Sequence, residues 1–256
     1  MSRHLDWPDC SNVRDLGGLP TLDGSVTRRG AAIRSDSLDR LTADGWRALQ
    51  DYGVRTIIDL RNEIERDAEP YSCDLTMLAV PVEDDTDSEF VARWRPFSTP
   101  HYYRAALDRW PTRTAAAVRA FVDAPAGGVV IHCGLGRDRT GLVTMLLLAV
   151  AGVGAPLIAD DYEMSAGRLP PLDVEALLAG PSNVNPRTGS QLEEDLATER
   201  RRRDATTDRQ AILELLATVD VEGYLLDAGL TAADIAAARA RLVGVSRPSP
   251  GGRPAG

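Results

Sequence analysis

The chain has 256 residues, of which 43% are hydrophobic, and a net charge of −9, which together indicate a soluble domain with a full hydrophobic core. The negative charge argues against a nucleic-acid-binding surface, and no uninterrupted apolar segment reaches the roughly 18 residues needed for stable membrane insertion. The first residues lack the apolar core of a signal peptide, so we expect a cytoplasmic location, with secretion by a non-classical route left open.

Alternating strand and helix patterns predict one α/β domain over residues 1–245, with a central, mostly parallel sheet, flanking helices and a helical C-terminal part. Residues 1–30 are rich in turn formers, so we expect loops and a short hairpin there. Short apolar and β-branched segments predict four strands, at residues 31–35, 54–60, 75–82 and 129–132.

The predicted helices are marked by capping and breaking residues. The first helix begins after Thr42, a favourable N-cap, and ends at Gly53. Residues 88–124 have helical character that several prolines interrupt. The helix expected over residues 139–151 is apolar on almost all sides, which predicts that it is buried.

The C-terminal part is predicted to be helical, with breaks, from Pro156 to Val243. Thr231 is the expected N-cap of the last helix in this part. The tail at 246–256 is rich in proline, glycine and serine, so we expect it to be disordered.

The stretch from His132 to Gly141, HCGLGRDRTG, joins the last predicted strand to the buried helix. Its cysteine, Cys133, lies where backbone amides and the positive end of a helix dipole favour a thiolate and attract a phosphate. The two glycines that follow permit the backbone torsions that aim successive amides at one centre. Arg139, further along the stretch, adds a planar donor that matches two phosphoryl oxygens.

The three cysteines, Cys10, Cys73 and Cys133, lie far apart in the sequence and form no CxxC pair. This spacing indicates neither a disulfide framework nor a zinc site. We therefore expect no metal and no cofactor, and a reduced thiol at Cys133.

The stretch resembles the signature of cysteine-based phosphatases, His-Cys-x5-Arg-Thr/Ser. Its Cys-x-x-Gly-[Lys/Arg]-Asp-Arg-Thr-Gly form is similar to that of the bacterial tyrosine and lipid phosphatase branch. Further motifs similar to this branch occur in order at residues 12–18, 34–35, 59–61, 161–162 and 221–224. The resemblance covers most of residues 10–243 and implies a phosphatase-like α/β fold.

The resemblance also implies roles for the charged and nucleophilic residues. Cys133 corresponds to the nucleophile, and Arg139 to the residue that binds the phosphoryl group and stabilises its transferring charge. In this branch the aspartate inside the signature, here Asp138, is implied to be the general acid. Asp84 and Asp85, which follow the third predicted strand, remain alternatives on a separate loop.

The remainder of the signature is expected to bind the substrate. The residues expected to do so are Gly134, Leu135, Gly136, Arg137 and Thr140. Arg137 stands where lysine is usual in the branch, in a chain whose 29 basic residues are all arginine. The substitution keeps the positive charge on a longer, planar side chain.

Five residues are expected to support the loop. His132 is expected to orient it by hydrogen bonding. Asp59 and Arg61 follow a predicted parallel strand, at the sheet edge where ligands bind, and are expected to form an ion pair. Arg14 and Asp15 are expected to brace the loop.

In the resembled branch, a helical segment after the signature can cover the active site, and residues 167–210 are its counterpart here. This possible lid contains the cluster Arg200 to Arg203. A solvated helix face and a contact with an acidic membrane surface are both open interpretations of that cluster.

These features predict a cysteine-dependent phosphatase that acts through a cysteinyl-phosphate on phosphotyrosine, other phosphoprotein residues or phosphoinositides. A phosphatase for small-molecule phosphates and a catalytically silent phosphate-binding module remain alternatives, although Cys133, Asp138 and Arg139 are all present. The expected partner is therefore a phosphorylated protein, lipid or small molecule.

Overall fold

The computed structural model describes residues 2–66, 75–94, 100–168, 194 and 206–244. Most of the possible lid at 167–210 lies outside these residues, as do Cys73 and the tail at 246–256. Among the helices that are described, none is both long and apolar enough to cross a membrane.

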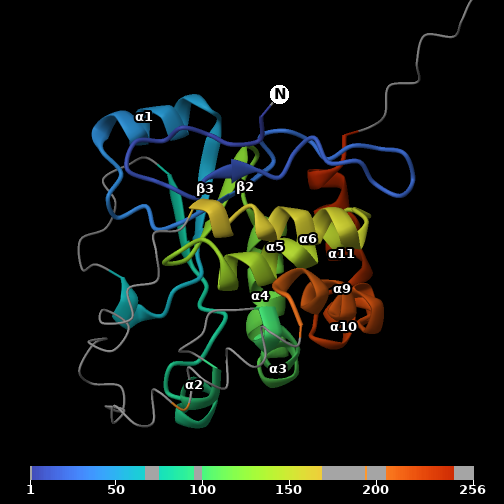
Figure 1. Ribbon diagram of the computed structural model, residues 1–256. Helices are drawn as coiled ribbons and strands as arrows, with labels where there is room; N and C mark the ends of the chain where they lie inside the picture. Colours follow the sequence, from blue (N-terminus) through green and yellow to red (C-terminus); the bar gives the residue numbers. More distant parts are fainter. Residues whose placement is uncertain (1, 67–74, 95–99, 169–193, 195–205, 245–256) are drawn as a thin grey trace, which may run out of the picture.

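A five-stranded sheet forms the centre of the described chain (Figure 1). Its strands are arranged in the order β1-β2-β5-β3-β4, and all neighbouring strands are parallel except β1 and β2. The strands are β1 (Arg14–Asp15), β2 (Ala32–Ser35), β3 (Val54–Asp59), β4 (Thr76–Ala79) and β5 (Gly128–His132). The predicted α/β class with a mostly parallel sheet is confirmed.

The N-terminal segment differs at one point from the loops predicted for residues 1–30. Arg14–Asp15 form β1, which pairs antiparallel with Ile33 and Arg34 of β2. A strand of two charged residues has no hydrophobic alternation, so the sequence alone does not reveal it. The expected short hairpin is present as an antiparallel bridge between Pro20 and Val26.

Helices alternate with the strands and continue beyond the last one. They are α1 (Ala43–Asp51), η1 (Glu63–Glu65), α2 (Ser88–Trp94), η3 (Pro100–Tyr102), α3 (Tyr103–Arg109), α4 (Pro111–Asp123), α5 (Asp138–Val150), α6 (Ala155–Glu163), η4 (Ala166–Arg168), α9 (Asp208–Thr218), α10 (Val221–Asp227) and α11 (Ala232–Leu242). The side chains of Thr42 and Thr231 cap α1 and α11 as predicted. Helix α5 begins at Asp138, one residue earlier than expected, and is buried on nearly all sides.

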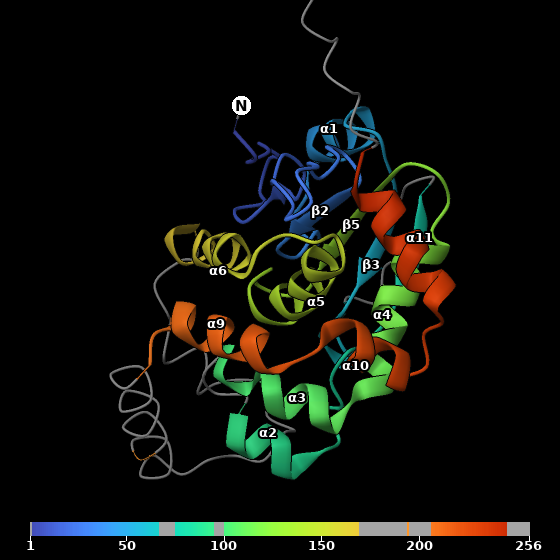
Figure 2. The ribbon, with the colours of Figure 1, turned by 90° about the vertical axis from the view of Figure 1, so that its right-hand side faces the viewer.

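Two hydrophobic cores cover the two faces of the sheet. Successive residues of a strand point to opposite faces, so Val129 and Ile131 of β5 enter the larger core and Val130 enters the smaller. The larger core includes the apolar side chains of α4 and α5, whereas Leu49 of α1 packs in the smaller core. Figure 1 shows α1 on one side of the strands and α5 on the other. Figure 2 shows α9 and α10 beneath α5 and α6, with α11 beside α4.

Candidate active site

The carboxyl ends of β2, β5 and β3 lie side by side. His132, the last residue of β5, is paired with Ser35 of β2 and with Asp59 of β3. Because α5 begins at Asp138, residues 133–137 form a short loop between strand and helix at this edge. Ligands of open α/β sheets bind at this edge, so the fold presents the signature loop in the expected position.

Four consecutive carbonyl groups of the loop are held by donors from outside it. The donor and acceptor pairs are Ser37 N to Gly134 O (2.9 Å), Asn12 Nδ2 to Leu135 O (2.9 Å), Arg34 Nη2 to Gly136 O (2.8 Å) and Arg34 Nη2 to Arg137 O (3.2 Å). In a trans peptide the N–H points away from the C=O. These bonds therefore turn the following amides away from the donors, which is the arrangement of an anion-binding loop.

Gly136 is required by two features of the loop. Its φ angle is +65°, in the left-handed region that side chains other than glycine rarely adopt. A Cβ atom at this position would also lie 2.4 Å from the carbonyl oxygen of Ser35, at the end of β2. The close approach of loop and strand therefore depends on glycine.

A cavity of about 290 Å³ opens over the loop, and Cys133, Asp138 and Arg139 all line it. Cys133 is only 3% exposed. The other lining residues are Asn62, Glu65, Glu83, Asp84, Asp85, Phe90, Val91, Trp94, Tyr102, Trp110, Gly134 and Leu135. The thiol, a guanidinium group and a buried carboxyl group thus line the same cavity.

Arg139 is held by two carboxylates. Glu65, at the end of η1, contacts both terminal nitrogens of the guanidinium group, and Glu83 lies 3.9 Å from Nε. Burial works against the positive charge, but these carboxylates outweigh it and raise the pKa of Arg139. A phosphoryl group that binds Arg139 must therefore share or replace the Glu65 carboxylate.

Asp138 and Asp84 lie in opposite electrostatic environments. Burial raises the pKa of Asp138, although Arg137 and a hydrogen bond from Tyr162 work in the other direction. Hydrogen bonds from Thr86 lower the pKa of Asp84, and Arg113, 2.8 Å away, adds to this effect. A raised pKa suits a group that must hold a proton for transfer, so this contrast favours Asp138 as the acid.

Arg137 is directed toward the C-terminal helices. Its Nη2 pairs with Asp208 at the start of α9 at 2.5 Å, and its guanidinium carbon lies 5.5 Å from the centre of the Tyr162 ring. Arg137 does not appear among the residues that line the cavity. In this structure its side chain joins the loop to α9, and contact between Arg137 and the substrate stays a prediction.

The expected ion pair at the end of β3 is present. Arg61 Nη2 lies 2.9 Å from Asp59, and Arg61 also pairs with Asp39. His132 is fully buried beside them, with Nε2 3.7 Å from Asp59 and Nδ1 3.3 Å from the carbonyl oxygen of Cys133. Burial lowers the pKa of His132, which keeps the ring neutral and suits the expected orienting role.

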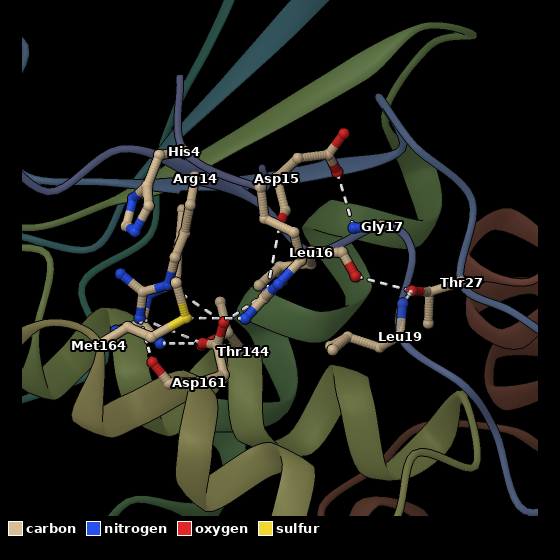
Figure 3. A network of polar contacts seen from close by, with 12 residues as sticks. His4, Arg14, Asp15, Leu16, Gly17, Leu19, Thr27, Thr144, Asp161 and Met164 are labelled. Carbon is tan, nitrogen blue, oxygen red and sulfur yellow. Dashed lines mark hydrogen bonds and ion pairs between the residues drawn. The ribbon is translucent and has the colours of Figure 1, made fainter. Parts of the chain in front are cut away.

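A buried ionic network lies behind the loop. Asp161, on α6, pairs with Arg14 of β1 at 3.1 Å, with Arg34 of β2 at 2.7 Å and with Arg3 at 2.7 Å. Figure 3 shows Arg14 and Asp161 in this network, beside Met164. Asp161 and the guanidinium groups of β1 and β2 are almost inaccessible to solvent. Arg34 therefore connects this network directly to the loop carbonyls.

Arg14 and Asp15 lie further from the loop than expected. Arg14 reaches it only indirectly, because it contacts Asp161 and the side chain of Asn12, which in turn binds the loop. The Asp15 carboxylate accepts hydrogen bonds from the amides of Gly17 and Gly30, so it organises the turns that follow β1. These contacts hold the framework around the loop.

Arg34 is the bracing residue for which sequence reasoning gave no role. Its position inside an apolar strand was the available signal, because a buried arginine needs a carboxylate or several carbonyl partners. Thr140 was expected to bind the substrate. Its hydroxyl is buried, and no residue in the described part of the chain accepts a hydrogen bond from it.

Comparisons with known proteins agree with this arrangement. A family model described as the tyrosine phosphatase family matches residues 5–244. A protein of Cupriavidus necator, provisionally named a tyrosine-protein phosphatase, is 31% identical over 172 residues, which is 63% of each chain. The triple specificity protein phosphatase PtpB of Mycobacterium tuberculosis is 26% identical over 289 residues, covering 93% of this chain and 99% of the relative.

A tyrosine-protein phosphatase of Nostoc commune is 28% identical over 153 residues, covering 57% of this chain and 52% of the relative. The chain thus spans less than two thirds of the Cupriavidus and Nostoc proteins, but nearly all of the Mycobacterium protein. The family match extends over almost the whole of the sheet and its helices. The chain therefore belongs to the tyrosine phosphatase family.

Proposed function

We propose that this chain is a cysteine-dependent phosphatase that hydrolyses phosphomonoesters through a cysteinyl-phosphate intermediate. The observation that carries the proposal is the convergence of Cys133, Asp138 and Arg139 on one cavity at the amino end of α5. The tyrosine phosphatase family match supports the same activity.

In the first step, the Cys133 thiolate attacks phosphorus in line with the departing oxygen, and an S–P bond forms as the P–O bond breaks. The loop amides and Arg139 bind the non-bridging oxygens, whose negative charge they stabilise. Asp138 gives its proton to the departing alkoxide or phenoxide, which leaves as an alcohol or phenol. In the second step, water attacks the phosphorus, the Asp138 carboxylate accepts a proton, and the thiolate departs.

The cavity lining favours an aromatic phosphate in a protein substrate. Four aromatic side chains line the cavity with Cys133, and they suit packing against a phenyl ring: Phe90, Trp94, Tyr102 and Trp110. Besides Asp138, four acidic side chains line it, and their negative charge opposes the additional phosphates of an inositide headgroup: Glu65, Glu83, Asp84 and Asp85. We therefore place phosphotyrosine first among the substrates, while the triple specificity in the name of the Mycobacterium relative supports a broader range.

Release of inorganic phosphate from parallel panels of phosphotyrosine peptides, phosphoserine peptides, phosphoinositides and small phosphate esters tests this function. The expected result is the highest kcat/KM on phosphotyrosine peptides. A higher kcat/KM on phosphoinositides would overturn the substrate order. Absence of turnover on all four panels, with retained phosphate binding, would favour a silent binding module.

Asp138→Asn is expected to lower kcat by roughly 10²- to 10⁴-fold on alkyl phosphates and to remove the basic limb of the pH–rate profile. Burial raises the pKa of Asp138, so the wild-type acid keeps its proton to higher pH than an exposed carboxyl group. The rate then falls as pH rises through that pKa. Asparagine has no proton to give, and the limb disappears.

The matched variants are Asp84→Asn and Asp85→Asn, because both side chains line the same cavity. The lowered pKa of Asp84 keeps that carboxylate ionised across the neutral range. Asp84→Asn is therefore expected to keep the basic limb, and Asp85→Asn is expected to keep it because Asp138 supplies the proton. If either variant lost the basic limb while Asp138→Asn kept it, the general acid would be assigned to the separate loop that carries Asp84 and Asp85.

A further inference from the structure

Tyr162 contacts the carboxyl group of Asp138 without lining the cavity itself. This tyrosine lies on α6 and is 3% exposed. Its hydroxyl donates a hydrogen bond of 2.8 Å to Asp138 Oδ1. Burial, followed by the negative charge of Asp138, raises the pKa of Tyr162 well above its usual value, so the hydroxyl keeps its proton and remains a donor.

A second tyrosine fixes the backbone at the same residue. The Tyr103 hydroxyl donates to the carbonyl oxygen of Asp138 at 2.7 Å, and the Tyr103 and Tyr162 rings meet edge to face at 6.1 Å. Gly141, one turn along α5, permits this approach. A Cβ atom there would lie 2.4 Å from the Tyr103 hydroxyl and 3.0 Å from the Tyr162 ring.

We infer that Tyr162 is a positioning residue that directs the acidic proton of Asp138 into the cavity. Oδ1 of Asp138 accepts the hydrogen bond from the Tyr162 hydroxyl. Because Asp138 also lines the cavity, we place its acidic proton on the other carboxyl oxygen, Oδ2. The inference rests on the proposed role of Asp138 as general acid. It assigns a function to the tyrosine of the Asp161-Tyr162 motif, whose aspartate serves the ionic network instead.

Tyr162 acts in both steps of the proposed reaction. In the first step, the proton on Oδ2 passes to the departing oxygen as the P–O bond breaks, and Asp138 becomes a carboxylate. The phenol hydrogen bond to Oδ1 stabilises that carboxylate, because a donor binds an ionised oxygen more strongly than a neutral one. In the second step, Oδ2 takes a proton from the attacking water while Tyr162 keeps its own.

Several charged and titratable groups surround Asp138 besides Tyr162. They come from its own loop and helix, from α9 and from the junction of η3 and α3, and they are Cys133, Arg137, Arg139, Asp208, Tyr102 and Tyr103. All of these side chains remain in Tyr162→Phe, although Arg137 also interacts with the Tyr162 hydroxyl. A change in the titration of Asp138 in this variant therefore reports the loss of the Tyr162 hydroxyl, whose hydrogen bond to Oδ1 is its direct contact with Asp138.

Tyr162→Phe tests the inference, because it removes the hydroxyl and keeps the ring that packs against α5. We expect kcat to fall by about 10-fold on alkyl phosphates, with a smaller fall on aryl phosphates whose leaving groups need less protonation. The basic limb of the pH–rate profile is expected to move to higher pH, because the lost donor no longer stabilises the Asp138 carboxylate. KM for the phosphate ester is expected to change little.

Two further variants separate positioning from a general structural effect. Tyr224→Phe is the matched control, because that hydroxyl donates to the carbonyl oxygen of Leu107 at 3.1 Å, outside the cavity lining. It is expected to leave the limb in place. In an Asp138→Asn background, Tyr162→Phe is expected to cause no further loss, because a residue that acts only through Asp138 has nothing left to position.

An equal fall in kcat on alkyl and aryl phosphates, with an unmoved limb, would overturn the inference. A further 10-fold fall in kcat when Tyr162→Phe is added to Asp138→Asn would also overturn it. Failure of the proposed function looks different, because Asp138→Asn itself would then keep its basic limb. The Tyr162 variants therefore test the positioning role, and Asp138→Asn alone tests the general acid.

Discussion

Cys133→Ser is expected to abolish hydrolysis of aryl phosphates, with a fall in kcat on the order of 10⁴-fold or more. A serine hydroxyl stays protonated near neutral pH and is a much weaker nucleophile than a thiolate. The loop amides and Arg139 remain, so phosphopeptide binding is expected to persist. Rapid acid quench with radiolabelled substrate should trap a phosphorylated protein from the wild type and none from the variant.

Cys10→Ser provides the matched control for Cys133→Ser. Cys10 lies outside the cavity lining, and burial, aided by Asp36, raises the pKa of its thiol to about 12. This thiol is therefore protonated at neutral pH, and its replacement is expected to leave kcat unchanged. Retained turnover in Cys133→Ser together with lost turnover in Cys10→Ser would reverse the assignment of the nucleophile.

Asp161→Asn is expected to lower the free energy of unfolding by about 3–5 kcal/mol. The substitution keeps the shape of the side chain but removes the negative charge that pairs with the buried Arg14 and Arg34. Two buried guanidinium groups then lack a compensating carboxylate. Urea denaturation at pH 7 measures the loss, and KM for phosphate esters is expected to rise because Arg34 also holds the loop carbonyls.

The pH dependence of unfolding gives an independent check on Asp161. Burial alone would raise its pKa, but Arg14, Arg34 and Arg3 hold that pKa well below its usual range. The Asp161 carboxylate therefore stabilises the fold fully above the pKa of an unfolded aspartate, which is about 4. This stabilisation is lost as pH falls through the lower pKa of Asp161 in the folded protein. The difference in stability between wild type and Asp161→Asn should narrow in that acidic range.

Asp160→Asn is the natural comparison, because Asp160 is the preceding residue and pairs with Arg209 at the surface. Surface ion pairs contribute little to stability, so no change in the urea midpoint is expected. An equal decrease of the urea midpoint in Asp160→Asn and Asp161→Asn would show that the buried Asp161 network stabilises the fold no more than a surface ion pair does.

Local patterns predicted the elements whose residues carry their own signals. The buried strands, the Thr42 and Thr231 caps and the burial of α5 depend on hydrophobic period and on side chains that bond their own backbone. The strand β1 (Arg14–Asp15) was missed because its pairing with β2 is decided by tertiary contacts.

The candidate site shows the same difference between residues that a local motif predicts and residues that tertiary packing brings together. The signature supplied Cys133, Asp138 and Arg139 as one spaced motif, and the cavity unites them. Their partners come from distant segments, such as Glu65 on Arg139 and Asp208 on Arg137. No local pattern relates such positions, because each pair forms only when separate helices and strands pack together.

The hydrogen bonds to the loop carbonyl groups have a consequence for the folding of this chain. The hydrogen bond from Asn12 to Leu135 closes a separation of 123 residues, and those from Arg34 to Gly136 and Arg137 close separations of 102 and 103. Contacts between residues so distant in sequence form late, because the entropy of closing long loops must first be overcome. Regained turnover after refolding is thus a stricter measure of a complete native chain than regained helix content.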